Sequence, residues 1–355
     1  MKKKRKINLA LQGGGSHGAY TWGILDRLLE EDSLVIDGIS GTSAGAMNGA
    51  VLVNGFLKGG KEEAKKALNK FWTDVGNMGR FSMVRTGVMD RIFRTWNMDL
   101  SFGYHWFNIL SHTFSPYDTN PSNANPLRML LEKDIDMEML REAKDVKLFI
   151  TATNVRTGRP RVFKTNEITA DVLLASACIP YLFQAVEVNG DHYWDGGYSG
   201  NPALWPLIYG CNTDDILVVQ INPLERHKLP KTAHEIMNRI NEVTFNSSLI
   251  AEIKAINFVS RMVHKKQLNK RVYKELRFHM IMPTDEMQEL NASSKLNSDL
   301  DFLLFLKKLG RRAADDWIKE NYSKVGKKSS FDIEKTFFSK LLEEHPYIDQ
   351  ELNIM

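Results

Sequence analysis

Two short glycine-rich segments, each directly after an apolar run, constrain the fold of this chain more than any other feature. Residues 13–18 (GGGSHG) follow the apolar run 7–11, and residues 41–45 (GTSAG) follow the run 35–39. An apolar run, a glycine turn and an amphipathic stretch predict a strand, a tight turn and a helix. The chain therefore begins with two strand–turn–helix units, which is typical of an α/β protein.

The second segment fits the G-x-S-x-G pattern of a nucleophile elbow, in which a serine lies on a strained turn between a strand and a helix. Gly41 and Gly45 flank this serine where strand and helix approach too closely for a Cβ atom. Ser43 is therefore the candidate nucleophile, and Thr42 and Ala44 complete the elbow.

The first segment offers a place for negative charge. Gly13, Gly14 and Gly15 expose consecutive backbone N–H groups near a predicted helix N-terminus, an arrangement that binds anions. If the two loops are neighbours on a parallel sheet, these amides face the oxyanion that forms when Ser43 attacks an acyl carbonyl. We therefore predict that they form an oxyanion hole.

A serine hydroxyl needs a base to take its proton, and the sequence offers two kinds. The first is a histidine in the chain order of the α/β-hydrolases, which place several strands before the elbow, whereas this chain has one strand–helix unit there. The candidate histidines are His227, His234, His264 and His279. The second is Asp195, which ends a predicted strand, precedes Gly196 and Gly197, and can act as a base if burial raises its pKa. We favour Asp195.

The rest of the chain alternates predicted strands and helices and then becomes mainly helical. Further strands are predicted at 146–155, 161–164, 183–188, 192–194, 216–221 and 277–282. Helices are predicted at 16–30, 44–57, 62–72, 170–176, 236–263 and 299–317. The turn dipeptide Asn189-Gly190 predicts a hairpin. We expect the helix at 236–263 to pack on the core, and contact with a membrane or partner is the alternative.

Residues 76–126 interrupt this pattern with many aromatic and methionine residues. These are Phe81, Met83, Met89, Phe93, Trp96, Met98, Phe102, Tyr104, Trp106, Phe107, Phe114 and Tyr117. A cap over an active site would have this composition, because acyl chains need an apolar, adaptable lining. An insertion that packs against its own core is the equal alternative.

Composition and charge exclude several classes of protein. The 355 residues hold two cysteines, Cys178 and Cys211, which argues for a reducing compartment and against a disulfide scaffold. No apolar stretch approaches the roughly 18 residues that a spanning helix needs, and the run at 7–11 is too short for a signal peptide. We therefore expect a cytoplasmic protein without a transmembrane helix or signal peptide.

Basic residues gather in several places although the net charge is only +4. Five of the first six residues are basic, and basic pairs follow at 265–266, 307–308, 311–312 and 327–328. We expect most of them to be solvated, and peripheral contact with an anionic membrane surface is the alternative. Without a recognition motif, the charge does not indicate a nucleic-acid partner.

Four ordered blocks of the chain resemble the patatin-like phospholipase family. They are residues 13–18, residues 41–45, residues 175–180 (ASACIP), and residues 195–202, which contain Asp195-Gly196-Gly197 and Asn201-Pro202. The resemblance covers roughly residues 7–222. It implies an acyl hydrolase with a Ser–Asp dyad, no cofactor, and no metal in the chemical step.

The resemblance also implies a fold, domains and residue roles. The expected fold is a three-layer α/β/α structure with a mainly parallel central sheet, plus a helical C-terminal extension. The catalytic domain would span residues 1–222, including the 76–126 cap, and a mainly helical region would span 223–355. The implied roles are nucleophile for Ser43, base for Asp195, oxyanion hole for Gly13, Gly14 and Gly15, and support for His17, Gly18, Gly196 and Gly197.

One position departs from the family, which usually has Arg or Lys where this chain has His17. A histidine is neutral much of the time near pH 7, so neutral acylglycerols and small acyl esters stay open as substrates beside phospholipids. If His17 supplies the missing charge, hydrolysis should weaken as the pH rises through its titration.

Two other functions remain as alternatives to a lipid acyl hydrolase. Gly13-x-Gly15-x-x-Gly18 also fits the dinucleotide fingerprint, but the acidic residue expected at the end of the second strand is represented only by Asp37, ahead of that end. A catalytically idle lipid-binding or scaffold protein is the other, and the intact Ser43 and Asp195 argue against it. The sequence does not indicate an oligomeric state.

Overall fold

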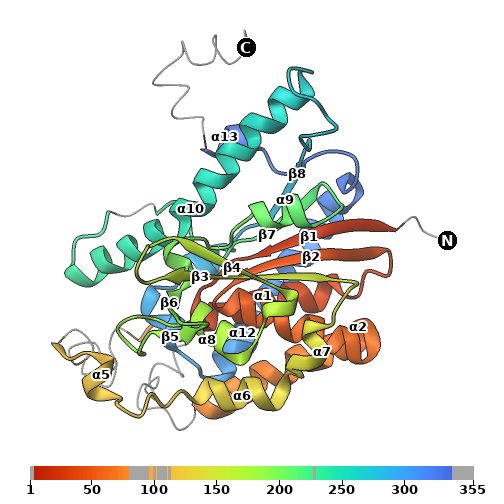
Figure 1. The fold of residues 1–355 in the computed structure, drawn as a ribbon. Helices are drawn as coiled ribbons and strands as arrows, with labels where there is room; N and C mark the ends of the chain where they lie inside the picture. The colour runs from red at the N-terminus through yellow and green to blue at the C-terminus, as the bar shows by residue number, and fades with distance from the viewer. Residues whose placement is uncertain are drawn as a thin grey trace.

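A computed structural model describes residues 4–79, 96–98, 101, 110, 113–226 and 229–337. At its centre is one eight-stranded sheet with the order β5-β6-β3-β2-β1-β7-β8, in which β4 also pairs with β3 (Figure 1). The strands are β1 (Arg5–Leu11), β2 (Leu34–Thr42), β3 (Lys147–Asn154), β4 (Pro160–Lys164), β5 (Val186–Val188), β6 (Asp191–Asp195), β7 (Asp215–Val219) and β8 (Arg277–Ile281). The predicted strands are all present, and the predicted 183–188 strand is shorter than expected.

The sheet is mixed, with a parallel centre. β1, β2, β3, β7 and β8 pair in parallel, whereas β4, β5 and β6 form antiparallel pairs. The β5–β6 hairpin turns at Asn189 and Gly190, both with positive φ (54° and 82°), as the dipeptide predicted.

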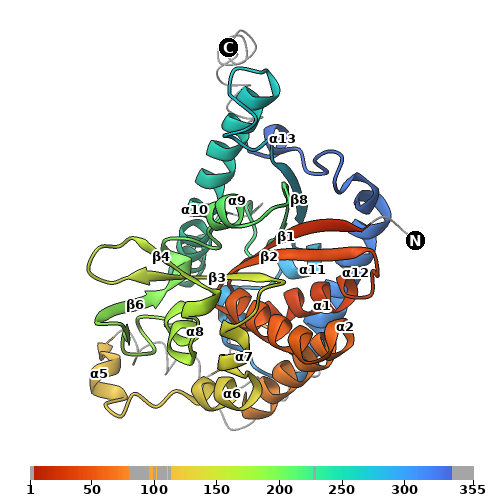
Figure 2. The same cartoon turned by 45° about the vertical axis from the view of Figure 1, so that its right-hand side comes forward.

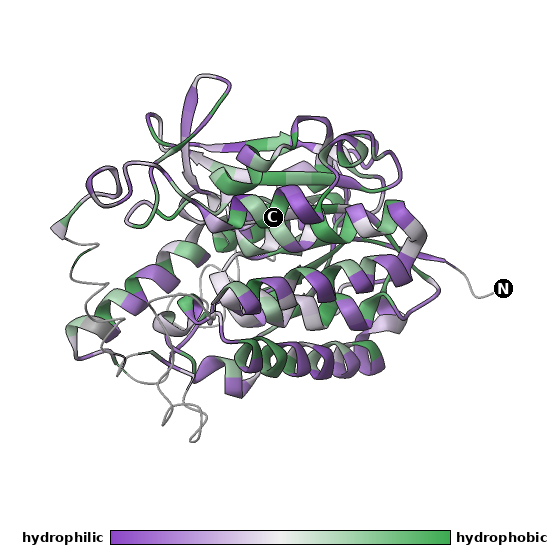
Figure 3. Cartoon of the chain, turned by 90° about the horizontal axis from the view of Figure 1, so that it is seen from below, coloured by the Kyte–Doolittle hydropathy of each residue, from purple (hydrophilic) through white to green (hydrophobic). Residues whose placement is uncertain are grey.

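Helices cover both faces of the sheet, so the predicted three-layer α/β/α fold is confirmed (Figures 1 and 2). One face carries α1 (Gly18–Leu28), α2 (Ala44–Gly79), α6 (Pro126–Asp134), α7 (Met137–Arg141), α8 (Ala170–Ser176) and α12 (Leu300–Asn321). The other carries α9 (Trp205–Gly210), α10 (Ala233–His264) and α13 (Ile333–Phe337). Hydrophilic and hydrophobic residues alternate along the helices in the view from below (Figure 3).

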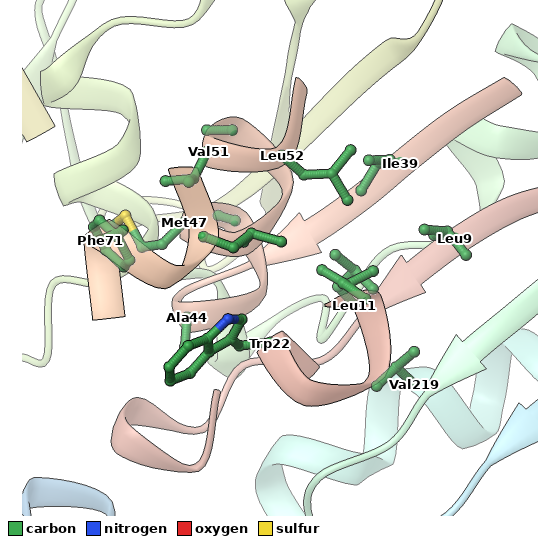
Figure 4. Packing of buried hydrophobic residues seen from close by; sticks show 14 of the residues in the cluster. Leu9, Leu11, Trp22, Ile39, Ala44, Met47, Val51, Leu52, Phe71 and Val219 are labelled. Carbon is green, nitrogen blue, oxygen red and sulfur yellow. The ribbon is translucent and has the colours of Figure 1, made fainter. Parts of the chain in front are cut away.

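Alternate residues of a strand belong to two separate hydrophobic cores, because successive side chains of a strand point to opposite faces of the sheet. Leu9 and Leu11 of β1 join the core under α1 and α2, whereas Ala10 joins the core under α9 and α10. In the first core, Trp22 of α1 and Met47 of α2 lie among side chains from the sheet (Figure 4). The carboxyl ends of β1, β2 and β7 are buried, so they hold the loops that follow them in fixed positions.

Two helices were predicted where the structure has α2, and they meet at a break. Gly60 has φ +71° and its neighbour Gly59 is also non-helical, so the segments before and after this pair correspond to the predicted 44–57 and 62–72. Several short helices were not predicted, namely α5 (Pro116–Thr119), α6, α7, α9, α11 (Asp285–Gln288) and α13. Asn125 and Asp136 cap α6 and α7 with their side chains, which is the signal that could have indicated two of them.

Most of the aromatic and methionine residues of the expected 76–126 cap lie outside the described residues. Of those described, Met98 is buried, and the Trp96 ring lies 5.3 Å from Phe302 of α12. Phe114 and Tyr117 line a cavity that is described below.

The long helix α10 packs on the sheet with only part of its apolar face. Leu249, Ile253 and Val263 are buried, whereas Ile236 and Ile240 near its start are largely exposed. The expectation of a core-packed helix therefore fails for the first turns of α10.

Residues after 222 contribute to the sheet and to the helical layer. β8 extends the sheet beside β7, and α12 packs along α1. Of the basic pairs in this region, Arg311 forms an ion pair with Glu30 and Arg312 forms one with Glu286. Among the described residues, none of the helices combines the length and apolarity that crossing a bilayer requires.

Close backbone contact between α1 and α12 yields a stability prediction. A Cβ at Gly310 would overlap the Tyr20 carbonyl oxygen, which no side-chain rotation can relieve. We expect Gly310→Ala to lower the free energy of unfolding by about 1–3 kcal/mol, despite the higher helix propensity of alanine. Urea unfolding measures this, and Lys308→Ala on the exposed side of α12 is the control. Equal stabilities of the two variants would contradict the close contact.

Candidate active site

The loops after three parallel strands meet at one edge of the sheet. Leu11 at the end of β1 is in register with Gly41 of β2 and with Val219 of β7. The loops that follow, residues 12–15, 43 and 220–222, therefore lie together at the carboxyl ends of the strands, where α/β proteins place their sites.

Ser43 lies on a tight turn between β2 and α2. Its φ is +53°, a conformation that a residue other than glycine rarely adopts. A Cβ on Gly41 would lie 2.6 Å from the Gly45 carbonyl oxygen, and one on Gly45 would overlap the Leu11 carbonyl. These glycines therefore allow strand and helix to approach around the serine, whose relative exposure is 7%.

The Ser43 backbone is fixed from the β3 side. Its N–H donates to Ser176 Oγ at 2.9 Å, and Ser176 Oγ donates to the Thr151 carbonyl at 2.7 Å. Ser176 belongs to the ASACIP block at the end of α8, so this block serves as a brace between the turn and the sheet.

Asp195 reaches Ser43 across β3. It is in register with Ala152 of β3, while Thr42 is in register with Thr151 on the other side of the same strand. A Cβ on Gly196 would overlap the Thr151 carbonyl oxygen, so glycine lets the chain fold back over β3 at this point. The Asp195 carboxyl accepts the Gly197 N–H at 2.7 Å, and the Ser43 hydroxyl lies close enough to stabilise its ionised form.

Burial makes Asp195 a stronger base than an ordinary aspartate. Its relative exposure is 2%, and loss of solvation raises its pKa from 3.8 to about 6. The Gly197 amide, the Ser43 hydroxyl and the positive charge of Lys295 oppose this shift. At neutral pH the carboxyl is mostly ionised, and its pKa lies close to the working pH.

The glycine loop lies against Ser43, as predicted. A Cβ on Gly13 would lie 2.7 Å from Ser43 Cβ, so the two loops are in direct contact. The Gly13 N–H is already engaged, because it donates to Asn201 Oδ1 at 2.7 Å. Within the described part of the chain, the structure shows no acceptor for the N–H groups of Gly14 and Gly15, and Gly15 has φ +58°.

A buried amide network, not predicted from the sequence, supports this loop. Gln12 Oε1 accepts the Ile221 and Asn222 N–H groups, both at 2.8 Å. Its Nε2 donates to Asn246 Oδ1 at 2.8 Å, and Asn222 Nδ2 donates to the Gly13 carbonyl at 3.0 Å. Gln12 and Asn222 each follow a predicted strand closely, which is the sequence signal that could have marked them.

The surroundings of His17 disfavour a positive charge on it, which argues against the hypothesis that it supplies one. Its relative exposure is 3%, and Nε2 is 2.7 Å from Ser294 Oγ. Burial holds its pKa well below 6.5, and the positive charges of Lys295 and Arg226 lower it further. Gly18, next to it, is in contact with Ala44, where a Cβ would lie 2.6 Å from the alanine Cβ.

The two histidines that the structure describes fully among the alternative bases have other partners. His279 is buried in β8, where Nε2 lies 2.9 Å from Asp215 Oδ1 and Nδ1 lies 2.8 Å from Ser330 Oγ. His264 is exposed at the end of α10 and lies 2.8 Å from Glu275. His227 and the His234 side chain lie outside the described residues.

Asp37, the acidic residue of the dinucleotide alternative, is also engaged. Its Oδ2 accepts the N–H groups of Asn212 at 2.6 Å and Thr213 at 3.1 Å. This carboxylate fixes the loop before β7, so it is not free for a ribose hydroxyl.

An apolar cavity of about 710 Å³ adjoins the Asp195 loop. Ser43 and Asp195 do not line it, but Trp194 and Tyr198, on either side of Asp195 in the chain, do. The other lining residues are Thr113, Phe114, Ser115, Pro116, Tyr117, Thr153, Asn154, Val155, Gly158, Pro180, Tyr181 and Phe183.

The sequence model of the family described as Patatin-like phospholipase matches residues 9–208, more than half of the chain. The chain is also 25% identical over 229 residues to the Uncharacterized protein YjjU of Escherichia coli (strain K12). That match covers 64% of this chain and 55% of YjjU, so the chain matches little more than half of that relative's length.

Two solved structures are similar at low identity. VipD from Legionella pneumophila has a TM-score of 0.38 and 16% identity, over 86% of this chain and 67% of that one. ExoU from the type III secretion system of Pseudomonas aeruginosa, solved in complex with SpcU, has a TM-score of 0.31 and 14% identity, over 99% and 61% of the two chains.

Proposed function

Because the chain belongs to the patatin-like phospholipase family, we propose that it is a lipid acyl hydrolase in which Ser43 and Asp195 form the catalytic dyad. The observation that carries this proposal is the Ser43 hydroxyl beside the buried Asp195 carboxyl, whose ionised form it stabilises, next to the glycine loop. A nucleophile, a base whose pKa is raised to about 6, and amides for an oxyanion are the groups that acyl transfer needs.

In the first half of the reaction, Ser43 Oγ attacks the ester carbonyl carbon and its proton passes to Asp195. The negative charge that develops on the carbonyl oxygen is stabilised by the N–H groups of Gly14 and Gly15. Each such donor contributes roughly 3–4 kcal/mol to the transition state. The bond to the alcohol oxygen then breaks, and Asp195 returns the proton to the leaving alcohol.

In the second half, water replaces the alcohol. The water oxygen attacks the acyl carbon while Asp195 takes a proton from the water, and the bond between the acyl carbon and Ser43 Oγ breaks. The serine oxygen recovers the proton from Asp195, so the acid is released and the enzyme is unchanged. The dyad needs no third group, because the Gly197 amide already orients the Asp195 carboxyl.

The apolar cavity beside the Asp195 loop is the place for the acyl chain in this proposal. Its aromatic walls, which include Phe183 and Trp194, match the chemistry of a hydrocarbon tail. Each buried methylene group contributes about 0.8 kcal/mol to binding, so a cavity of this size would favour long chains. The substrate class is therefore an acyl ester of a lipid.

Changing the cavity should change the preference for chain length. We expect Val155→Trp, which fills part of the cavity, to lower kcat/KM for p-nitrophenyl decanoate about tenfold and for p-nitrophenyl butyrate by less than about threefold. Val155→Ala at the same position enlarges the cavity and is the matched control. Equal losses for both esters in the tryptophan variant would place the acyl chain elsewhere.

The proposed function is tested by hydrolysis and by covalent labelling. The purified protein should hydrolyse p-nitrophenyl butyrate, and a fluorophosphonate should label it at the peptide that contains Ser43. A catalytically idle lipid-binding protein would bind vesicles without turnover or labelling. Turnover with the label on a different residue would contradict the dyad but leave a hydrolase.

A further inference from the structure

A lysine from beyond the matched family region lies at the glycine loop. Lys295 belongs to the 3-10 helix Ala292–Leu296, which comes far after residue 208 in the chain. Its backbone carbonyl lies against Gly15, because a Cβ on that glycine would be 2.5 Å from the Lys295 carbonyl oxygen. The C-terminal region therefore contacts the loop directly.

The side chain of Lys295 reaches the other end of the same loop. Its Nζ donates to Asn222 Oδ1 at 2.6 Å, and Asn222 Nδ2 donates to the Gly13 carbonyl at 3.0 Å. Lys295 thus contacts the loop through its backbone at Gly15 and through Asn222 at Gly13. The two amides that remain for an oxyanion lie between these anchor points.

Lys295 also lies close to the Asp195 loop. Its Nζ is 5.7 Å from the centre of the Phe245 ring, a cation–π contact. Phe245 occupies the space where a Cβ of Gly197 would be, and it packs against Tyr198 with 5.4 Å between ring centres. The ammonium group is therefore separated from the Asp195 loop by one aromatic ring.

Lys295 is the cation whose charge stabilises the ionised carboxyl of Asp195. The groups that face it are Glu242 of α10, Arg226, Asp195 and His17. Glu242 is already paired with Arg226 at 2.5 Å and with Arg239 at 3.0 Å, and His17 is neutral. The positive charge of Lys295 also acts on the carboxyl of Asp195, where it favours the ionised form.

We propose that Lys295 is a cationic positioning residue of the active site, which holds the glycine loop through Asn222 and electrostatically favours the ionised Asp195. This inference rests on the proposed function. It gives the C-terminal region a defined part in the chemistry and explains how a site with a neutral His17 retains a positive charge.

The pH dependence follows from the two groups. Burial lowers the pKa of Lys295 from 10.5 to about 8, and the negative charge of Glu242 opposes that shift. The charge of Lys295 is therefore present below about pH 8 and is lost above it. Asp195 must be ionised to act as a base, so activity should rise through about pH 6. Above about pH 8 the uncharged Lys295 holds Asn222, and through it the glycine loop, less strongly, so activity should fall.

The test compares pH profiles of kcat/KM for p-nitrophenyl butyrate in the wild type, Lys295→Met and Lys295→Arg. Lys295→Met should lower activity about tenfold or more near pH 7. It should also move the midpoint of the acid limb to a pH about 0.5–1 unit higher, because the nearby positive charge that stabilises the Asp195 carboxylate is removed. Lys295→Arg keeps the positive charge at high pH and should move the alkaline limb to higher pH.

A merely structural lysine would change the rate without moving either limb, and that outcome would overturn the inference. If Lys295→Met does not fold, an alkaline limb that stays near pH 8 in Lys295→Arg also overturns it, as does a wild-type profile without an alkaline limb. Lys307→Met, a partly buried lysine over the Trp22 ring away from the site, is the matched control and should leave both limbs in place. A wild type without turnover would instead contradict the proposed function.

Discussion

Replacing Ser43 with alanine is expected to lower kcat/KM for p-nitrophenyl butyrate by about 10⁴–10⁶ while the protein stays folded. The side chain is the nucleophile of the proposed reaction, and its hydroxyl lies beside the Asp195 carboxyl that takes its proton. The remaining activity would come from water activated by Asp195 next to the amides of Gly14 and Gly15. Stopped-time product assays at high enzyme concentration can measure this low remaining activity.

The fold should tolerate this substitution because Ser43 is held through its backbone. The bonds from its N–H to Ser176 Oγ and from the Met47 N–H to its carbonyl do not involve its hydroxyl. Ser33→Ala, just before the opposite end of β2, removes a hydroxyl that bonds to Tyr322 and is the matched control. If Ser43→Ala kept more than about a tenth of the wild-type activity, Ser43 would not be the nucleophile.

The elbow and the strands could be predicted because their requirements are local. Gly41 and Gly45 are needed by the turn around Ser43 itself, and the apolar run 7–11 is buried on both faces of the sheet. The pairing of Ser43 with Asp195 could not be derived from local pattern, since it depends on β3 lying between their strands. It was predicted only through the resemblance to a family.

The electrostatic state of the site could not be predicted, because it depends on burial by distant segments. His17 looked like a titratable group in the sequence, but the segment around Ser294 encloses it and keeps it neutral. The engagement of the Gly13 amide depends on Asn201, which lies far away in the chain. Lys295 has no motif of its own, and only the fold brings it to the glycine loop.

Replacing Asp195 with asparagine should remove activity and stabilise the protein at the same time. Asparagine keeps an oxygen that can accept the Gly197 N–H, but it cannot take the Ser43 proton, so kcat/KM should fall by about 10³–10⁴. The pKa of Asp195 is raised from 3.8 to about 6 in the folded state, so folding buries a charge that the unfolded chain keeps in water.

The sign of the effect on stability follows from this shift. A carboxyl whose pKa is higher in the folded state than in the unfolded state adds to the free energy of unfolding. This contribution is complete below about pH 4 and is lost as the pH rises through about 6. A shift of about two units corresponds to about 3 kcal/mol. The stability gained in Asp195→Asn should therefore be smaller at pH 5 than at pH 8, where we expect about 2–3 kcal/mol.

Urea unfolding of both proteins at pH 5 and pH 8 measures this difference. Asp191→Asn, at the other end of β6, is the matched control for loss of a carboxyl from the same hairpin. A gain that does not depend on pH would mean that folding does not raise the pKa of Asp195, and the proposed buried base with a raised pKa would then be wrong. A gain that grows with pH, together with lost turnover, would show that the site keeps a costly buried carboxylate because the reaction needs it.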